Sequence, residues 1–245
     1  MTDRFVVGVP LGRWQTNCWV VGDYDRGECV IIDPGETGAE VVPQILEHTG
    51  ARCTGILVTH GHLDHFWSVP QLARELDVPV LLHPEDRYLW DSPISGFAEG
   101  SGPEMLKAQF GLVWEPEDER VRDVKDGERV TFAGIDFDIE HNPGHTPGHV
   151  TFLGRDLTGA SLDFALGSAD AASPDVLFSG DLIFAGSIGR TDFPRGSTAD
   201  IMRSLARTVL PLQDDTLILS GHGTDTTVGR ERLTNQFLHE AARGA

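Results

Sequence analysis

Short apolar runs separated by Gly, Asp and Pro dominate the first third of the chain. The runs FVVGV, NCWVV and ECVIID are rich in β-branched and aromatic residues and predict three strands, with a hairpin turn at DYDRG. Apolar periodicity predicts a helix over residues 39–48, a buried strand at GILVTH, a second helix ending at Leu76 and a further strand at VPVLLHP. Strands that alternate with helices in this way indicate a layered α/β fold.

The second half repeats this arrangement after a polar connection. Residues 92–120 are rich in Gly, Pro, Ser and acidic side chains and predict a surface connection with one short helix at residues 105–110. Strand-like segments follow at ERVTFAG, IDFDIEH, HVTFLG, DVLFSGD and TLILSGH. Between the last two, Ser197 is expected to cap a helix whose apolar face, Ile201, Leu205 and Val209, docks on a sheet.

Residues 155–174 break this pattern because they are polar, rich in small residues and placed between two predicted core strands. They form either a lid-like loop or a solvated surface insertion, and we favour the insertion. Apart from this segment, residues 1–245 are expected to form a single domain, since a 40% hydrophobic content suits one globular core.

Charge and composition restrict the partners. The net charge of −19 repels phosphate backbones and anionic lipid surfaces, so we expect neither a nucleic-acid nor a membrane partner. The N-terminus lacks the pattern of a signal peptide, and no apolar run approaches the roughly 18 residues of a membrane span, which predicts a cytoplasmic protein. Cys18, Cys29 and Cys53 lack CxxC spacing and are expected to be reduced, buried thiols.

The stretch THGHLDH, residues 59–65, places three imidazoles and a carboxylate directly after an apolar run. His60 and His62 lie two residues apart, so in an extended chain both rings project in the same direction and can bind one metal. Asp64 and His65 follow where the chain turns into a helix and can form a second set of ligands. Such donors suit zinc, manganese or ferrous iron.

Three other predicted strands are each followed by a residue that could complete these ligand sets. His145 lies in the loop NPGHTPGH, Asp181 follows Gly180 in LFSGDLIF, and His222 lies between two glycines in LILSGHG. Open α/β layers place their sites at the carboxyl ends of strands, so these residues and THGHLDH are expected to meet at one edge. The sequence therefore predicts a metal centre.

The motifs THGHLDH, PGHTPGH, SGD and SGHG closely resemble those of the metallo-β-lactamase superfamily over nearly the whole chain. The resemblance implies an αββα sandwich, with two mixed β-sheets face to face and helices outside. It also implies two divalent metal ions, zinc above all, with iron or manganese as alternatives. The implied ligand sets are His60, His62 and His145 for the first ion and Asp64, His65 and His222 for the second, with Asp181 bridging the two.

Within the superfamily, FAGSIGRTDFPRG and the ending GHGTDTTVGRERLTNQFL resemble the short bacterial branch of the glyoxalase II-type hydrolases. This resemblance implies hydrolysis of thioesters of hydroxy acids with glutathione or a similar thiol, as in S-lactoylglutathione, by a metal-bridging hydroxide. Asp64 and Asp181 would be the catalytic carboxylates. About twenty residues follow His222, fewer than the C-terminal helical domain that binds glutathione in longer members needs, so the thiol is left open.

Other polar residues have supporting interpretations. Asp33 is either an acceptor that orients a ligand histidine or a turn residue at a strand end. Arg190 could bind a substrate carboxylate or carbonyl while Asp192 holds it, or the two form a structural pair. His149 is expected behind the ligands or at the surface rather than as a ligand. His48, His83, His141 and His239 show no ligand-like context.

The main alternative activity is that of a persulfide dioxygenase, a similar relative with a comparable GRTDF stretch and a single ferrous iron, which His60, His145 and Asp181 would bind here. A β-lactamase is disfavoured because it would place Cys at position 181, and a tRNA-processing nuclease would need a basic path. A non-enzymatic binding protein would be expected to lose ligands, whereas all seven are present. The oligomeric state is left open.

Overall fold

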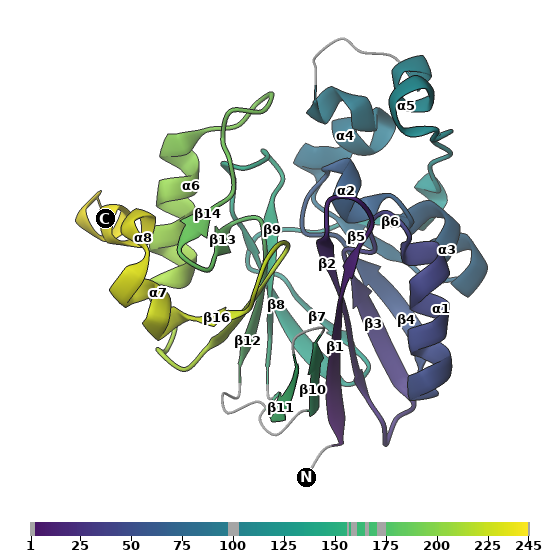
Figure 1. The fold of residues 1–245 in the computed structure, drawn as a ribbon, viewed down its shortest axis with the longest axis horizontal. Helices are drawn as coiled ribbons and strands as arrows, with labels where there is room; N and C mark the ends of the chain where they lie inside the picture. Colours follow the sequence, from purple (N-terminus) through teal and green to yellow (C-terminus); the bar gives the residue numbers. More distant parts are fainter. Residues whose placement is uncertain are drawn as a thin grey trace.

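Two β-sheets stack face to face in the computed structural model, with helices on their outer faces (Figure 1). The structure describes residues 3–97, 103–155, 157, 161–164, 167–170 and 175–244. This arrangement is the predicted αββα sandwich, and both sheets are mixed, because each contains parallel and antiparallel neighbours. The prediction of the fold class is therefore confirmed.

The first sheet has the strand order β11-β10-β1-β2-β3-β4-β5-β6. Its strands are β1 (Arg4–Leu11), β2 (Thr16–Asp23), β3 (Glu28–Ile32), β4 (Arg52–Leu57), β5 (Val80–Leu82), β6 (Val121–Asp123), β10 (Ser161–Phe164) and β11 (Gly167–Asp170). The hairpin predicted at DYDRG joins β2 and β3.

The second sheet has the strand order β16-β15-β12-β9-β8-β7. Its strands are β7 (Arg129–Phe132), β8 (Ile135–His141), β9 (Val150–Gly154), β12 (Val176–Gly180), β15 (Leu217–Ser220) and β16 (Thr226–Thr227). A separate short hairpin consists of β13 (Ile183–Phe184) and β14 (Ser187–Ile188).

Alternation along the strands divides the apolar residues among three buried layers. In β2, Trp19 points between the two sheets while Val20 points to the outer helices, because successive side chains of a strand face opposite ways. In β9, Phe152 lies between the sheets and Leu153 packs on the helices of the other side. Strands buried on both faces read as continuous apolar runs, which explains the pattern of the sequence.

The helices cover the outer faces of the two sheets (Figure 1). On the side of the first sheet, α1 (Gly38–Thr49) and α3 (Val69–Leu76) lie along its outer face, and α2 (Leu63–Phe66), α4 (Arg87–Asp91) and α5 (Pro103–Phe110) lie toward the upper ends of its strands in Figure 1. The same part of the chain contains the short 3₁₀ turns η1 (Pro84–Asp86), η2 (Pro93–Gly96) and η3 (Asp118–Arg120). The helices over the second sheet are α6 (Thr198–Ser204) with the π-helical turn Leu205–Val209 that continues it, α7 (Val228–Thr234) and α8 (Gln236–Gly244).

The predicted cap and apolar face of α6 are confirmed. The Ser197 hydroxyl accepts a hydrogen bond from the Asp200 N–H, and Ile201, Leu205 and Val209 pack with Leu177 of the second sheet.

The described parts of the predicted insertion at residues 155–174 include β10 and β11, which extend the first sheet beyond β1. Their short, polar sequences give no strand pattern, so the sequence does not predict them. Figure 1 places both strands near the N-terminus, at the end of the sheets opposite α2. Residues 156, 158–160, 165, 166 and 171–174, which belong to the same predicted insertion, lie outside the described residues.

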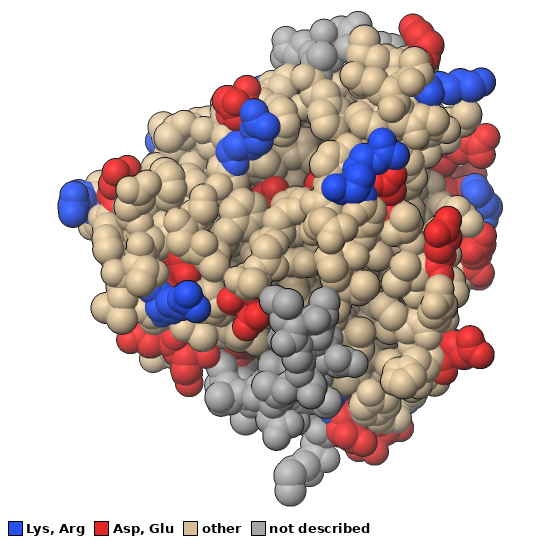
Figure 2. All heavy atoms as spheres, in the orientation of Figure 1, with Lys and Arg blue, Asp and Glu red and all other residues tan. Residues whose placement is uncertain are grey.

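The face shown in Figure 2 has separated Lys and Arg side chains, and Asp or Glu atoms lie beside several of them. The surface is hollowed at the upper centre of this view, in the region between α2 and the β13–β14 hairpin of Figure 1, and acidic atoms are visible in the hollow. Among the described residues, no helix is both long enough and apolar enough to cross a membrane.

Two histidines that the sequence marks as ordinary stack on each other where the sheets meet. His83 follows β5 and His141 ends β8, and their ring centroids lie 4.0 Å apart at an interplanar angle of 14°. Burial, followed by the neighbouring His141, lowers the pKa of His83 to about 4, although Asp123 and Asp126 oppose this shift. The folded protein therefore favours the neutral His83 ring.

This shift predicts a loss of stability at acid pH. Because the folded pKa lies below the unfolded value of about 6.5, the contribution of His83 is present above pH 6.5 and is lost as the pH falls toward 4. The expected contribution is about 1–2 kcal/mol of unfolding free energy. We expect His83→Phe to reduce the stability change between pH 7 and pH 4.5 in urea titrations. His48→Gln, which changes an exposed histidine of α1, should leave this stability change as in the wild type. An equal change in unfolding free energy between pH 7 and pH 4.5 in all three proteins would contradict the prediction.

Candidate metal centre

Residues 59–65 span the turn after β4 and the first residues of α2, at the edge of the first sheet. Leu63 and Phe66, three residues apart in α2, are fully buried in the core. Since residues three apart lie on one face of a helix, their burial turns Asp64 and His65 away from the core and toward the loops of the second sheet. The apolar residues of the motif therefore direct its polar residues.

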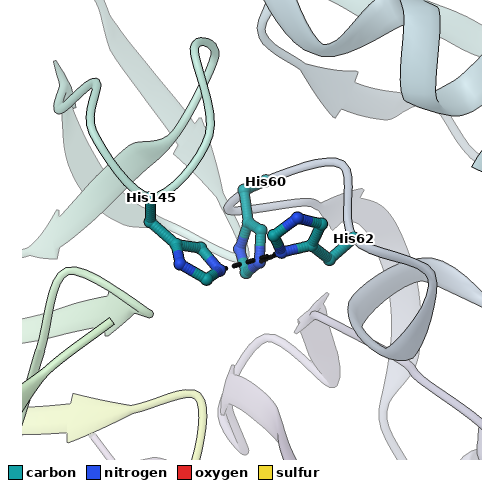
Figure 3. Close-up of side chains that lie close together, drawn as sticks. All are labelled: His60, His62 and His145. Atoms are coloured by element: carbon teal, nitrogen blue, oxygen red, sulfur yellow. Dashed lines mark hydrogen bonds between the residues drawn. The ribbon is translucent and has the colours of Figure 1, made fainter. Parts of the chain in front are cut away.

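Three histidines form the first cluster, which is shown in Figure 3. His62 Nδ1 lies 3.1 Å from His60 Nε2 and 2.8 Å from His145 Nε2. The loop after β8 supplies His145, and the turn after β4 supplies the other two. Three ring nitrogens directed at one point form a ligand set of the kind that binds zinc or a similar cation.

Burial favours the neutral rings of His60 and His62 in this cluster. It is the main cause that lowers the pKa of His62 to about 3, with the neighbouring His145 as the next cause. Burial, followed by His65 and His145, lowers the pKa of His60 well below its ordinary value. A neutral imidazole has a free lone pair and can bind a cation without first losing a proton.

Asp64, His65 and His222 form a second cluster, whose ligand atoms lie within 4.8 Å of one another. Asp64 Oδ2 lies 3.2 Å from His222 Nε2 and 3.6 Å from His65 Nε2. His222 follows β15, and its loop is held to the start of β2 because the Asn17 N–H donates to the Gly221 carbonyl at 2.7 Å. The second predicted ligand set is thus also brought together.

Asp181, which follows β12, faces both clusters. One oxygen, Oδ1, lies 3.4 Å from His65 Nε2, and the other, Oδ2, lies 3.4 Å from His145 Nε2 and 3.8 Å from His222 Nε2. A carboxylate placed between two groups of ligands is the arrangement expected of a bridging residue. The bridging role itself remains a prediction.

The charges of the second cluster depend on one another. Burial is the largest single influence on Asp64 and Asp181 and opposes their ionisation, but the neighbouring histidines, His65 above all, together outweigh it. They lower the pKa of Asp64 to about 2 and that of Asp181 further below its ordinary value. Burial likewise opposes a charge on His65, but Asp64, Asp181 and Asp33 raise its pKa well above the ordinary range. A cation at this cluster would take over the role of the His65 proton.

The residues present fit a pair of divalent cations. His65 Nε2 and Asp181 Oδ1 are buried, point into the centre and lie 3.4 Å apart, and neither has a hydrogen-bond partner among the described residues, which is costly unless another group satisfies them. At Gly221 a Cβ would lie 2.4 Å from Asp181 Oδ1 and 2.6 Å from His65 Cε1, so glycine keeps the same space open. The imidazole and carboxylate donors match zinc, iron and manganese.

Asp33 is directed at His65. Its Oδ2 lies 2.9 Å from His65 Nδ1 and accepts a hydrogen bond from the Thr59 hydroxyl at 2.6 Å, while Oδ1 accepts the Thr59 N–H at 2.8 Å. The contact holds a proton on Nδ1, so Nε2 is the nitrogen that faces the centre and would give up its proton to a cation. Of the two interpretations of Asp33, this geometry fits the residue that orients a ligand.

We expect Asp33→Asn to weaken metal binding at the second cluster by about 10–100-fold, because the amide no longer accepts the imidazole hydrogen bond as a carboxylate does. Competition with a coloured chelator measures the affinity. Asp23→Asn is the matched control, since Asp23 is also a buried aspartate but caps the distant turn at Arg26. Equal metal affinities in the two variants would contradict the orienting role.

Arg190 and Asp192 form the predicted pair at the rim. Arg190 Nε and Nη2 each donate to Asp192 at 2.7 Å, both side chains are exposed, and the guanidinium lies over the Phe193 ring. Substrate binding by this side chain remains a prediction. The sequence missed another contact, since the Arg190 backbone carbonyl lies 2.7 Å from His145 Nδ1 and so orients that ring. A backbone acceptor leaves no residue-type signal to detect.

His149 lies directly behind the ligands. It is fully buried, stacks on His60 with ring centroids 5.1 Å apart, and its Nε2 accepts the Asp181 N–H at 3.1 Å. Burial, followed by His145, lowers its pKa well below the ordinary value, so that the ring stays a neutral acceptor. His149 thus lies behind the ligands, one of the two positions expected from the sequence, and its ring holds the backbone N–H of Asp181.

Comparisons with known proteins agree with this geometry. The profile of the metallo-beta-lactamase superfamily matches residues 11–159 and 166–222. A hydroxyacylglutathione hydrolase GloC of Haemophilus influenzae is 34% identical over 232 residues, which are 94% of this chain and 96% of that protein. An uncharacterized protein of Mycobacterium tuberculosis is 34% identical over 238 residues, which are 97% of this chain and 99% of that protein.

Solved structures show the same fold. The B3 metallo-beta-lactamase BLEG-1 superposes with a TM-score of 0.77 at 30% identity, covering 96% of this chain and 99% of its own. The protein TTHA1623 in a di-iron-bound form superposes with a TM-score of 0.72 at 34% identity, covering 95% of this chain and 100% of its own. ETHE1 from Myxococcus xanthus, at 21% identity and a TM-score of 0.70 over 97% of this chain and 90% of its own, shares the fold.

This chain belongs to the metallo-beta-lactamase superfamily, as the sequence motifs predict. The two His/Asp clusters and the superfamily together indicate a metal-dependent, hydrolase-like enzyme.

Proposed function

We propose that the protein hydrolyses thioesters of hydroxy acids with glutathione or a similar small thiol, using two divalent metal ions, for which zinc is the first candidate. The convergence of seven ligand-type side chains into two clusters that share Asp181 carries this proposal. The 34% identity to a hydroxyacylglutathione hydrolase over 96% of that protein supports the substrate class. The di-iron-bound form of TTHA1623 keeps iron as an alternative metal.

The side chains of the chain define how such a reaction would be organised. His60, His62 and His145 would hold one cation, and Asp64, His65 and His222 the other. When bound, the cations supply a water nucleophile at neutral pH and polarise the substrate carbonyl.

Asp64 is suited to orient the attacking water, because Oδ2 faces the centre while the Thr16 hydroxyl donates to the same oxygen at 3.0 Å and fixes the carboxylate. The low pKa of Asp64, about 2, keeps it a proton acceptor throughout the neutral range. A thiolate is a good leaving group, so the site needs no strong general acid. The exposed Arg190 at the rim is available for a carboxylate of the substrate.

A combined metal and activity measurement tests the proposal. The purified chain is loaded with zinc, iron or manganese, its metal content is counted, and S-lactoylglutathione is supplied with and without oxygen. Two metal equivalents and thioester cleavage without oxygen are the expected result. One iron per chain together with oxygen consumption on glutathione persulfide would instead assign the dioxygenase activity, for which His60, His145 and Asp181 would suffice. Two metals with no turnover of any thioester would contradict the substrate class alone.

A further inference from the structure

A buried carboxylate outside the ligand sets lies between the two loops of the first cluster. Asp86, the last residue of η1, is fully buried. Its Oδ2 accepts the Gly61 N–H at 2.7 Å and the Thr146 hydroxyl at 2.6 Å, and its Oδ1 accepts the Gly148 N–H at 2.7 Å. All three donors are neutral groups.

These donors adjoin the three histidines of the first cluster. Gly61 lies between His60 and His62 in the chain, and Thr146 directly follows His145. The two loops come from different sheets and are more than eighty residues apart in sequence, since the contact between His62 and His145 spans 83 positions. One carboxylate therefore joins the backbones that carry all three ring nitrogens.

The glycines of both motifs allow this approach. A Cβ at Gly148 would lie 2.6 Å from Asp86 N and 2.8 Å from Asp86 Oδ1. At Gly61 it would lie 3.0 Å from Asp86 Cβ and 2.8 Å from Leu89 Cβ. Real Cβ atoms do not come this close to fixed atoms, so glycine at both positions is explained by packing against Asp86 and the start of α4.

The cost of burying the Asp86 carboxylate favours a specific role in joining the two loops over a general contribution to stability. Burial raises the pKa of Asp86, and the hydrogen bonds from Thr146, Gly61 and Gly148 oppose that shift. A buried carboxylate is expensive unless its oxygens are satisfied, and three donors on two oxygens satisfy it only while both loops hold their positions. An asparagine could not replace it, because its NH₂ group would face an N–H donor of one loop.

We propose that Asp86 is a positioning residue that fixes the loops of His60, His62 and His145 relative to each other and thereby builds the first metal cluster before any cation binds. This inference rests on the metal centre of the proposed function and is independent of the substrate. The Asp86 side chain accepts hydrogen bonds from the loops and acts on the cation only through the three histidines.

The test is a titration of the metal-free, full-length Asp86→Asn variant with Co²⁺ and then Zn²⁺, followed by visible absorption and chelator competition. One metal equivalent, at the first cluster, is expected to bind about 10–100-fold more weakly than in the wild type, while the other keeps its affinity. Thr146→Val removes one of the three hydrogen bonds and is expected to give a smaller loss at the same cluster. It also tests the proposal if Asp86→Asn does not fold.

Glu231→Gln is the matched control. Glu231 is also a fully buried carboxylate and accepts hydrogen bonds from Thr226, Gly186 and Asn235, but it joins α7 to the β13–β14 hairpin. It should lower the melting temperature of the metal-free protein without changing the affinity of the first cluster. If Asp86→Asn and Thr146→Val likewise lower only the melting temperature, Asp86 is a structural residue and the proposal is wrong. Loss of thioester turnover with normal metal binding would contradict it as well.

Discussion

Asp181→Ala is expected to lose one or both metal equivalents and to reduce thioester hydrolysis about 10³-fold or more. The reason is geometric, because the two oxygens of Asp181 are divided between the clusters, with Oδ1 near His65 and Oδ2 near His145, each at 3.4 Å. Alanine would also leave the buried charge of protonated His65 with fewer carboxylates to stabilise it. Metal analysis of the purified variant and a continuous thiol-release assay measure both effects.

Asp25→Ala controls for the loss of an aspartate, since Asp25 is exposed in the turn between β2 and β3. This variant should keep its metal and its turnover. An Asp181→Ala protein with two metal equivalents and wild-type hydrolysis would show that Asp181 neither bridges nor binds the cations.

Gly221→Ala has the second largest expected effect, because the substitution adds a single methyl group inside the centre. The new Cβ would lie 2.4 Å from Asp181 Oδ1 and 2.6 Å from His65 Cε1, so one of these ligands must move. Gly221 does not have a positive φ, and the backbone accepts alanine without strain. We expect the loss of one metal equivalent and a fall in turnover of about 10²-fold, the scale expected for a misplacement of about 1 Å.

Gly229→Ala provides the comparison for crowding alone. A Cβ there would lie 2.9 Å from Asp214 Cβ, a similarly tight contact on α7 away from the centre. Its metal content and turnover should match the wild type. If Gly221→Ala retains both metals at full occupancy, the space beside Asp181 and His65 is not a cation site.

The sequence predicted the ligand-type residues of the centre, because each is a histidine or aspartate placed just after a predicted strand. Each of the motifs THGHLDH, PGH, SGD and SGHG follows a predicted strand, and because the ends of these strands meet at one edge, the side chains converge as expected. The roles of these residues, and those of Arg190 and Asp192, remain predictions. The alternation of strands and helices predicted a layered α/β fold, whereas the division into two sheets with outer helices was implied by the resemblance of the motifs to the superfamily.

What the sequence did not reveal depends on contacts without such a signal. Asp86 stands in an ordinary polar turn, and its importance arises only from donors in two distant loops. The Arg190 carbonyl that orients His145 is backbone, and His83 and His141 are paired only by the docking of the sheets. The strands β10 and β11 are too short and polar to show a period.

The division of ligands between the sheets has a mechanical consequence. In the first cluster, two histidines come from the turn after β4 and the third from the loop after β8. In the second cluster, Asp64 and His65 come from α2, which follows that turn, and His222 comes from the loop after β15. A cation bound by such a set would link the two sheets, so its binding free energy would add to the free energy of unfolding of the domain. Removal of the metal by a chelator should therefore weaken the contact between the two sheets first at this edge, while the opposite ends of the strands stay packed.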